Sequence, residues 1–321
     1  MQSPSARLLA GRFLAPLVIL SVALMPAAAL AQSPAASPAP SAAGPVSVVD
    51  ADGTSVDITD SSKVVTLGGV ITETAFALGA GGQVVGVDAS SYYPPDAMAL
   101  GAPLPYYRQL AAEPVLAVGP TLILGTDEVG PPEVVQQLKD AGVTTLLLTQ
   151  DLSVEGTQAL ITTVGTALGR DAEAAALNET LTADLAAATE LVARATSAPT
   201  VMFLLLPPGA PLLVSGTGSA ADTMITLAGA TNALTSFPQY VPLTPEAAVA
   251  AAPDIILTTT SSLEAAGGID GLLAMPGIAE TPAGAAKAIV AMDDLLLLGF
   301  GPRLGQAVAE LATQLHPELA Q

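Results

Sequence analysis

The chain has no cysteine and no tryptophan, and it has only one histidine among its 321 residues. Without cysteine it has no disulfide framework, no thiolate metal site and no iron–sulfur cluster. The same absence excludes a lipid-modified N-terminal cysteine. The single histidine, His316, lies near the C-terminus, where we expect it to be solvated at a frayed helix end.

Basic residues are also scarce. Nine Lys and Arg stand against 29 Asp and Glu, which gives a formal net charge of −20. Binding of nucleic acid or of anionic lipid needs clustered Lys and Arg. We therefore expect no nucleic-acid partner and no direct membrane insertion, and we expect a soluble monomer.

Residues 1–31 have the pattern of a cleavable signal peptide. A start with two arginines and no acidic residue is followed by an apolar run, which ends in Ala-Leu-Ala at 29–31. That small-x-small ending predicts cleavage before Gln32. The alternative is an uncleaved anchor, because the run is almost long enough to span a membrane, but Pro16 and Pro26 interrupt it. Together with the missing lipidation site, cleavage predicts a free periplasmic protein.

The next segment, residues 32–45, is mostly Pro, Ala and Ser without periodicity, and we expect a disordered linker. From residue 46 the pattern changes. Two alternating runs around Asp52 and Gly53 predict a β-hairpin.

Short apolar strands then alternate with helical segments. Strands are predicted at 64–69, 84–88, 122–126, 144–149, 201–206, 212–216, 255–260 and 288–292. Helices are predicted at 72–78, 131–141, 154–168, 220–228, 245–251 and 302–315. Near-continuous apolar strands separated by helices indicate parallel sheets covered on both faces.

A long helical pattern without Gly or Pro runs from Asp171 to Thr196. It divides the chain into an N-terminal α/β lobe at 46–168, a bridging helix at 169–197 and a C-terminal α/β lobe at 198–321. We therefore expect two Rossmann-like lobes joined by a single long α-helix, with a ligand cleft between them. Loops at the carboxyl ends of the strands should line that cleft. A single bridging helix predicts that closure on a ligand is small.

Four stretches carry a resemblance to a known family. They are residues 68–95, 104–124, 212–234 and 296–308. With them the chain, from residue 46 onward, resembles the helix-backbone class of periplasmic binding proteins, which includes receptors for cobalamin, iron–siderophores and heme. The Tyr-x-Arg-x-Leu segment in the second stretch is most similar to the receptors of bacterial heme ABC importers. The resemblance implies a protein that captures heme and delivers it to an ABC permease and its ATPase.

In those heme receptors a tyrosine of this segment is the axial iron ligand. The resemblance assigns that role to Tyr106, with Tyr107 as the nearest rival because Pro105 stands where the family has glycine. A phenolate is a hard oxygen ligand suited to ferric iron. Since free tyrosine has a pKa of about 10, nearby positive charge should help ligation. Arg108 would supply it, by hydrogen-bonding the phenolate or by pairing with a heme propionate.

Three further residues are candidates for heme contact, and each has more than one possible role. Tyr93 either edges the cleft or packs within its loop, and Tyr240 either stacks on the porphyrin or acts as a second ligand. Ser219 either bonds a ligand carboxylate or caps a helix.

Two glutamates are assigned to permease docking by the resemblance alone: Glu113 and Glu246, one in each lobe. Each also begins a predicted helix, where a carboxylate complements the helix dipole. Glu73 is predicted to be a first-turn helix residue without a functional role.

Two alternative functions stay open. An iron–siderophore or cobalamin receptor would have the same fold, although iron–siderophore sites usually contain several Arg or aromatic side chains. A secreted hydrolase is the alternative of another class. The chain has no cysteine nucleophile and no Gly-x-Ser-x-Gly elbow, and its one histidine is terminal. We expect no catalytic residues.

Overall fold

The computed structural model describes residues 45–101 and 103–320, so the predicted signal peptide and nearly all of the predicted linker lie outside the described residues. All of the described residues belong to one contact unit, residues 40–321. Within them, no helix combines the length and the apolar character that crossing a bilayer requires.

A parallel sheet forms the centre of the N-terminal lobe, as the sequence predicts. Its strand order is β4-β3-β5-β6, and every pairing is parallel. The strands are β3 (Val64–Leu67), β4 (Val84–Val87), β5 (Leu122–Thr126) and β6 (Thr144–Leu148). The predicted hairpin is also confirmed: β1 (Val46–Val49) pairs with β2 (Ser55–Ile58). Gly53 in its turn has a φ of 78°, a conformation that glycine adopts without strain.

Helices cover both faces of this sheet. They are α1 (Gly69–Ala77), α2 (Pro95–Met98), α3 (Ala112–Ala117), α4 (Pro132–Asp140) and α5 (Val154–Leu168), with short 3₁₀ helices η1 (Gly81–Gln83) and η2 (Tyr107–Gln109). Adjacent residues of one strand pack on opposite faces of the sheet. Val64 packs with residues of α1 and α5, whereas Val65 packs with residues of α3 and α4. This alternation explains the near-continuous apolar strand sequences.

The sheet of the C-terminal lobe is mixed, which corrects the expectation of a wholly parallel sheet. Its order is β10-β8-β7-β11-β12, with β9 also paired to β7. The strands are β7 (Thr200–Leu205), β8 (Leu213–Ser215), β9 (Thr231–Asn232), β10 (Tyr240–Pro242), β11 (Ile255–Thr259) and β12 (Ile289–Met292). The 206–212 connection is shorter than the dozen or so residues of a crossover, so β8 runs antiparallel to β7.

Helices of the C-terminal lobe are mostly short. They are α7 (Ala220–Leu227), α8 (Pro245–Ala251), α9 (Thr260–Ala265), α10 (Gly268–Leu273), α11 (Pro282–Ala286), α12 (Asp294–Leu298), α13 (Leu304–Leu315) and the 3₁₀ helix η3 (Pro317–Ala320). His316 follows α13, but the prediction that it is solvated is wrong. Its side chain is fully buried, and its Nε2 lies 3.0 Å from the carbonyl oxygen of Ala228.

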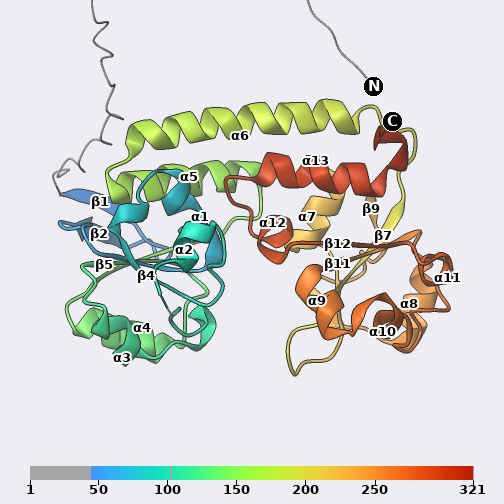
Figure 1. The fold of residues 1–321 in the computed structure, drawn as a ribbon, viewed down its shortest axis with the longest axis horizontal. Coiled ribbons are helices and arrows are strands. Elements are labelled where there is room, and N and C mark those ends of the chain that lie inside the picture. Colours follow the sequence, from blue (N-terminus) through green and yellow to red (C-terminus); the bar gives the residue numbers. More distant parts are fainter. Residues whose placement is uncertain (1–44, 102, 321) are drawn as a thin grey trace, which may run out of the picture. The chain divides into compact units, whose positions relative to one another are not determined.

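The predicted bridge is α6 (Asp171–Val192), which ends four residues before the expected position. It packs against α5 of the first lobe and α13 of the second (Figure 1). Two glycines allow close approach: a Cβ on Gly165 of α5 would lie 2.5 Å from the Cβ of Ala174, and one on Gly305 of α13 would lie 2.5 Å from the Cβ of Asp184. One apolar core cluster also contains buried residues of both lobes and of α6.

Candidate functional site

The 104–110 segment lies at the carboxyl ends of β4 and β5, where the fold predicts a ligand site. Leu104 N–H donates to the Val87 carbonyl at 2.8 Å, which continues the edge of β4. Further along, the backbone of Tyr107 is hydrogen-bonded to both neighbouring loops. Its N–H donates to the Asp88 carboxylate at 3.2 Å, and its carbonyl accepts from Gly130 N–H at 2.9 Å. The segment is therefore held from two sides.

Tyr107, Arg108 and Glu128 form one polar cluster. Arg108 Nε donates to the Tyr107 hydroxyl oxygen at 3.1 Å, and the guanidinium also pairs with the Glu128 carboxylate. The Tyr107 hydroxyl in turn donates to Glu128 Oε2 at 3.2 Å. The Arg108 Cζ lies 5.3 Å from the centroid of the Tyr107 ring, within the range of a cation–π contact. The Tyr107 hydroxyl thus has both a donor and an acceptor.

The electrostatics of the cluster follow from this packing. Burial, followed by the neighbouring Tyr106, raises the pKa of Tyr107. Burial alone would lower the pKa of Arg108, but Tyr107 and Glu128 outweigh it and raise that pKa. Tyr107 is therefore a neutral phenol and Arg108 a fixed cation in the ligand-free protein.

Tyr106 differs from its neighbour in exposure. It keeps 40% of its surface exposed, and its ring stands edge-on to that of Tyr107 at 4.7 Å between centroids. Among the described residues, Arg108 and Glu128 bond to the Tyr107 hydroxyl and not to that of Tyr106, which lies beside the Tyr107 hydroxyl and helps to raise the pKa of Tyr107. The structure brings three predicted site residues together here: Tyr106, Tyr107 and Arg108.

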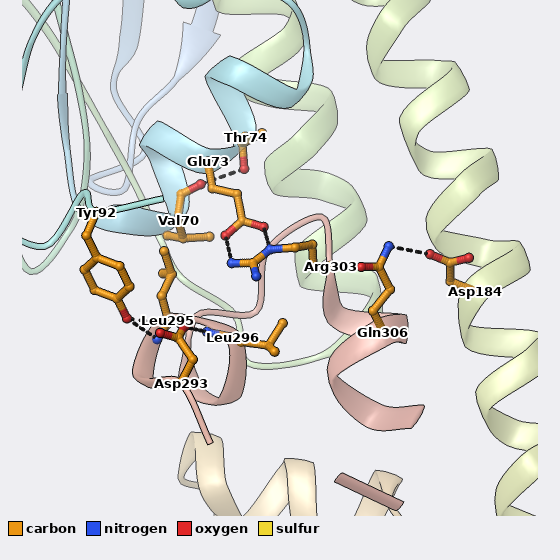
Figure 2. A network of polar contacts seen from close by, with 10 residues as sticks. All are labelled: Val70, Glu73, Thr74, Tyr92, Asp184, Asp293, Leu295, Leu296, Arg303 and Gln306. Carbon is orange, nitrogen blue, oxygen red and sulfur yellow. Dashed lines mark hydrogen bonds and ion pairs between the residues drawn. The ribbon is translucent and has the colours of Figure 1, made fainter. Parts of the chain in front are cut away.

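Tyr93 belongs to a different contact, which joins the two lobes. Arg303, at the start of α13, donates from Nε and Nη2 to the two carboxylate oxygens of Glu73 at 2.7 and 2.8 Å (Figure 2). The Tyr93 ring lies 3.6 Å from the Arg303 Cζ. We call Glu73, Tyr93 and Arg303 the interlobe clasp. Because α1 begins at Gly69, Glu73 lies in its second turn, so the first-turn prediction is wrong.

The segment from Asp293 to Arg303 carries further ties to the N-terminal lobe. The Tyr92 hydroxyl accepts from Leu295 N–H at 2.7 Å and donates to Asp293 Oδ1 at 3.3 Å (Figure 2). Gln150 Nε2 donates to the Gly299 carbonyl at 2.9 Å. The sequence analysis predicted none of these contacts, although it placed the tyrosine of the clasp at the edge of the cleft or within its loop.

A cavity of about 370 Å³ lies beside the clasp. It is lined by Glu73, Phe76, Ala77, Tyr93, Pro94, Asp96, Leu177, Thr180, Asp184, Pro302, Arg303 and Gln306. Tyr93 lines this cavity, whereas the Tyr106 segment does not contribute to it. The contact of Tyr93 with heme stays a prediction.

Tyr240 and Ser219 face the interior of the C-terminal lobe. The Tyr240 ring packs edge-on to Phe203 at 6.2 Å, and burial raises the pKa of Tyr240, opposed by hydrogen bonds at Ala221 and Ser219. Ser219 is fully buried, and its hydroxyl accepts from Asp222 N–H at 3.2 Å as the N-cap of α7. The capping alternative is confirmed. The ligand roles of both residues stay predictions, and these contacts do not favour them.

Glu113 and Glu246 lie where the sequence places them. Each is exposed in the first turn of a helix, α3 and α8 respectively. An exposed apolar side chain follows each glutamate by three residues, Leu116 in α3 and Val249 in α8. Each glutamate thus shares its helix with an exposed apolar neighbour. Their docking role stays a prediction.

Within the described residues, no three His, Cys, Asp or Glu side chains cluster as a metal site. The model for the family described as periplasmic binding protein matches residues 64–296. The chain belongs to the periplasmic binding protein family. The predicted fold class, two α/β lobes joined by one long helix, agrees with that membership.

Solved heme-binding proteins share this fold, and a curated cobalamin-binding protein is similar in sequence. The periplasmic heme-binding protein RhuT from Roseiflexus sp. RS-1, in apo form, is 42% identical with a TM-score of 0.78, over 82% of this chain and 100% of that one. BhuT, a periplasmic heme-binding protein in complex with two hemes, is 43% identical with a TM-score of 0.75, over 80% and 98%. A cobalamin-binding protein of Halobacterium salinarum is 29% identical, over 95% of this chain and 85% of that protein.

Proposed function

We propose that this periplasmic binding protein captures heme, holds its iron through Tyr106 and delivers it to an ABC permease. The observation that carries the proposal is the exposed Tyr106 at the carboxyl ends of β4 and β5, next to a Tyr107 whose hydroxyl is bonded by Arg108. The likeness to RhuT and BhuT supports heme as the cargo.

The residues present suit this cargo. Tyr106 is an exposed residue whose phenol can supply an anionic oxygen to ferric iron, a ligand type known for heme. Arg108, in the same segment, supplies a positive charge that can pair with a heme propionate. The chain has 29 acidic and only nine basic residues, so few other side chains could supply a positive charge to the ligand.

Hemin titration of three proteins tests the ligand: the wild type, Tyr106→Phe and Tyr107→Phe. The wild type and Tyr107→Phe should show the charge-transfer band of a ferric tyrosinate complex. Tyr106→Phe should lose that band and bind hemin at least about tenfold more weakly, because phenylalanine keeps the ring and removes only the oxygen.

Far-UV circular dichroism should show that all three proteins remain folded, since Tyr106 is exposed. If Tyr106→Phe keeps the tyrosinate band and the wild-type affinity, Tyr106 is not the ligand. If the wild type fails to bind hemin, the proposed cargo is wrong.

A corrinoid cargo is the second candidate, favoured by the match to a cobalamin-binding protein over 95% of this chain. Titration of the same preparation with cyanocobalamin distinguishes the two. Tight cyanocobalamin binding that Tyr106→Phe leaves unchanged would favour the corrinoid.

Export and docking complete the proposal. Residues 1–31 would be removed on export, so the periplasmic form should begin at Gln32 by N-terminal sequencing. Glu113 and Glu246 would contact the permease, one from each lobe, because both are exposed and neither has a place in the Tyr106 cluster.

A further inference from the structure

Tyr106 and Tyr107 are adjacent and chemically identical, so the choice of iron ligand depends on the surroundings of each hydroxyl. A phenol has one O–H to donate and a lone pair that accepts readily. At Tyr107 both are in use, since Arg108 Nε donates to the oxygen and the O–H is donated to Glu128. Tyr106 keeps 40% of its surface exposed, and among the described residues neither Arg108 nor Glu128 hydrogen-bonds its hydroxyl, whose neighbour is the Tyr107 hydroxyl.

Backbone hydrogen bonds around Glu128 fix its position relative to Tyr107. It follows β5, whose end is fixed by the 3.0 Å bond from Asp127 N–H to the Leu148 carbonyl. Two residues later, Gly130 N–H donates to the Tyr107 carbonyl, and Leu110 N–H donates to the Gly130 carbonyl, both at 2.9 Å. The Glu128 carboxylate therefore meets Tyr107 from a loop that is itself bonded to the tyrosine segment.

Iron coordination by Tyr107 would break this arrangement. The hydroxyl would have to give up the hydrogen bond that it donates to Glu128, and an anionic oxygen would then face the carboxylate at close range. Like charges in contact are unfavourable. Coordination by Tyr106 leaves the Tyr107–Glu128 bond intact.

We propose that Glu128 selects the iron ligand: by holding the Tyr107 hydroxyl and the Arg108 guanidinium together, it leaves Tyr106 as the tyrosine that binds iron. This inference rests on the proposed heme-binding function. Glu128 is a positioning residue, because it acts through Tyr107 and Arg108 rather than on the iron. Arg108 donates from Nε to Tyr107 and from Nη2 to Glu128, and its other N–H groups stay available for a propionate.

The ligand-free protein tests the hold on Tyr107 directly. Nitration with tetranitromethane reports the freedom of a tyrosine hydroxyl, and the Tyr106→Phe background leaves Tyr107 as the only reactive ring of its segment. Adding Glu128→Ala to Tyr106→Phe should raise the nitration rate of Tyr107 about tenfold, because a charged hydrogen-bond partner is lost. Glu128→Gln keeps an acceptor at this position and should raise the rate less.

Asp127→Ala in the same Tyr106→Phe background is the matched control. Asp127 is the adjacent carboxylate of the same exposed loop, and among the described residues its side chain makes no hydrogen bond to Tyr107 or Arg108. It should leave the nitration rate unchanged. Equal rates with and without Glu128 would overturn the proposed hold.

Hemin spectra test the selection itself. Tyr106→Phe should lack the tyrosinate charge-transfer band, and Tyr106→Phe with Glu128→Ala should regain it through the released Tyr107. Faster nitration without return of the band would overturn the selection. A wild type that does not bind hemin defeats the proposed function, whereas a wild type that binds while nitration stays unchanged defeats only the role of Glu128.

Discussion

At the carboxyl end of β4, the Asp88 carboxylate accepts hydrogen bonds from three backbone N–H groups: those of Gly68, Ser90 and Tyr107, at 2.9 to 3.2 Å. Two serine hydroxyls donate to it as well, and it is only 1% exposed. These donors come from three different loops at one edge of the sheet. A single side chain therefore sets the position of the tyrosine segment relative to the strands.

Asp88→Asn should weaken both the fold and the binding of hemin. The amide replaces one acceptor oxygen with a donor, which leaves at least one buried N–H unpaired at a cost of about 1–3 kcal/mol. Urea denaturation should show the lower stability, and hemin titration the lower affinity. Asp96→Asn, an exposed residue in the first turn of α2, is the control: it should leave hemin affinity unchanged and lower stability by no more than about 0.3–1 kcal/mol, the contribution of a first-turn charge. An unchanged urea midpoint for Asp88→Asn would contradict the assigned role.

The residues of the site differ in how far the sequence could predict them. Tyr106, Tyr107 and Arg108 are contiguous, so a family pattern identifies them together. Glu128 lies 20 positions from Arg108, and Arg303 lies 230 positions from Glu73, so their pairing depends on strand order and on the packing of the lobes. The orientation of Tyr93 and Tyr240 likewise depends on neighbours that hydrophobic periodicity does not reveal.

Helices and strands were predictable where the sequence marks their ends. Helix α5 matches its predicted range because Ser153 caps it and Gly169, in the left-handed conformation, ends it. The four short helices between residues 260 and 298 were missed, since five or six residues are too few to show a period. The direction of β8 was also missed, because it depends on the length of a connection rather than on the apolar pattern.

Helices α3 and α8 present the two glutamates that the family resemblance assigns to the permease. Replacing Glu113 and Glu246 together by alanine should leave hemin affinity unchanged, because neither side chain takes part in the Tyr106 cluster. It should reduce heme uptake several-fold in cells that express the protein with its permease, since each substitution removes an exposed charge that no described residue pairs with.

Glu133→Ala is the matched control for uptake, because Glu133 is also exposed in the first turn of a helix, α4. Loss of first-turn charge costs each helix only about 0.3–1 kcal/mol, so both the double variant and Glu133→Ala should fold. Normal uptake by the double variant would exclude the docking role.

At the scale of the whole molecule, the chain passes between the lobes once, through α6, yet other contacts join them. One cluster of buried apolar residues includes α6 and extends through both lobes. The 293–303 segment also hydrogen-bonds to α1, α5 and the Tyr92 loop. Close packing of Gly165 and Gly305 against α6 leaves little room for sliding. A small closure on ligand binding, predicted from the single bridging helix, is therefore expected for additional reasons.

The clasp between Glu73 and Arg303 is the most buried ion pair among these ties, with side chains 4% and 19% exposed. Removing either charge alone, as Glu73→Gln or Arg303→Gln, should lower the free energy of unfolding by about 2–4 kcal/mol, because it leaves the partner buried and unpaired. The double variant should recover part of that loss in a double-mutant cycle measured by urea denaturation. Asp270→Asn, which breaks the exposed pair with Lys287, should change stability by less than about 1 kcal/mol. Additive effects of Glu73→Gln and Arg303→Gln would mean that the clasp does not couple the lobes.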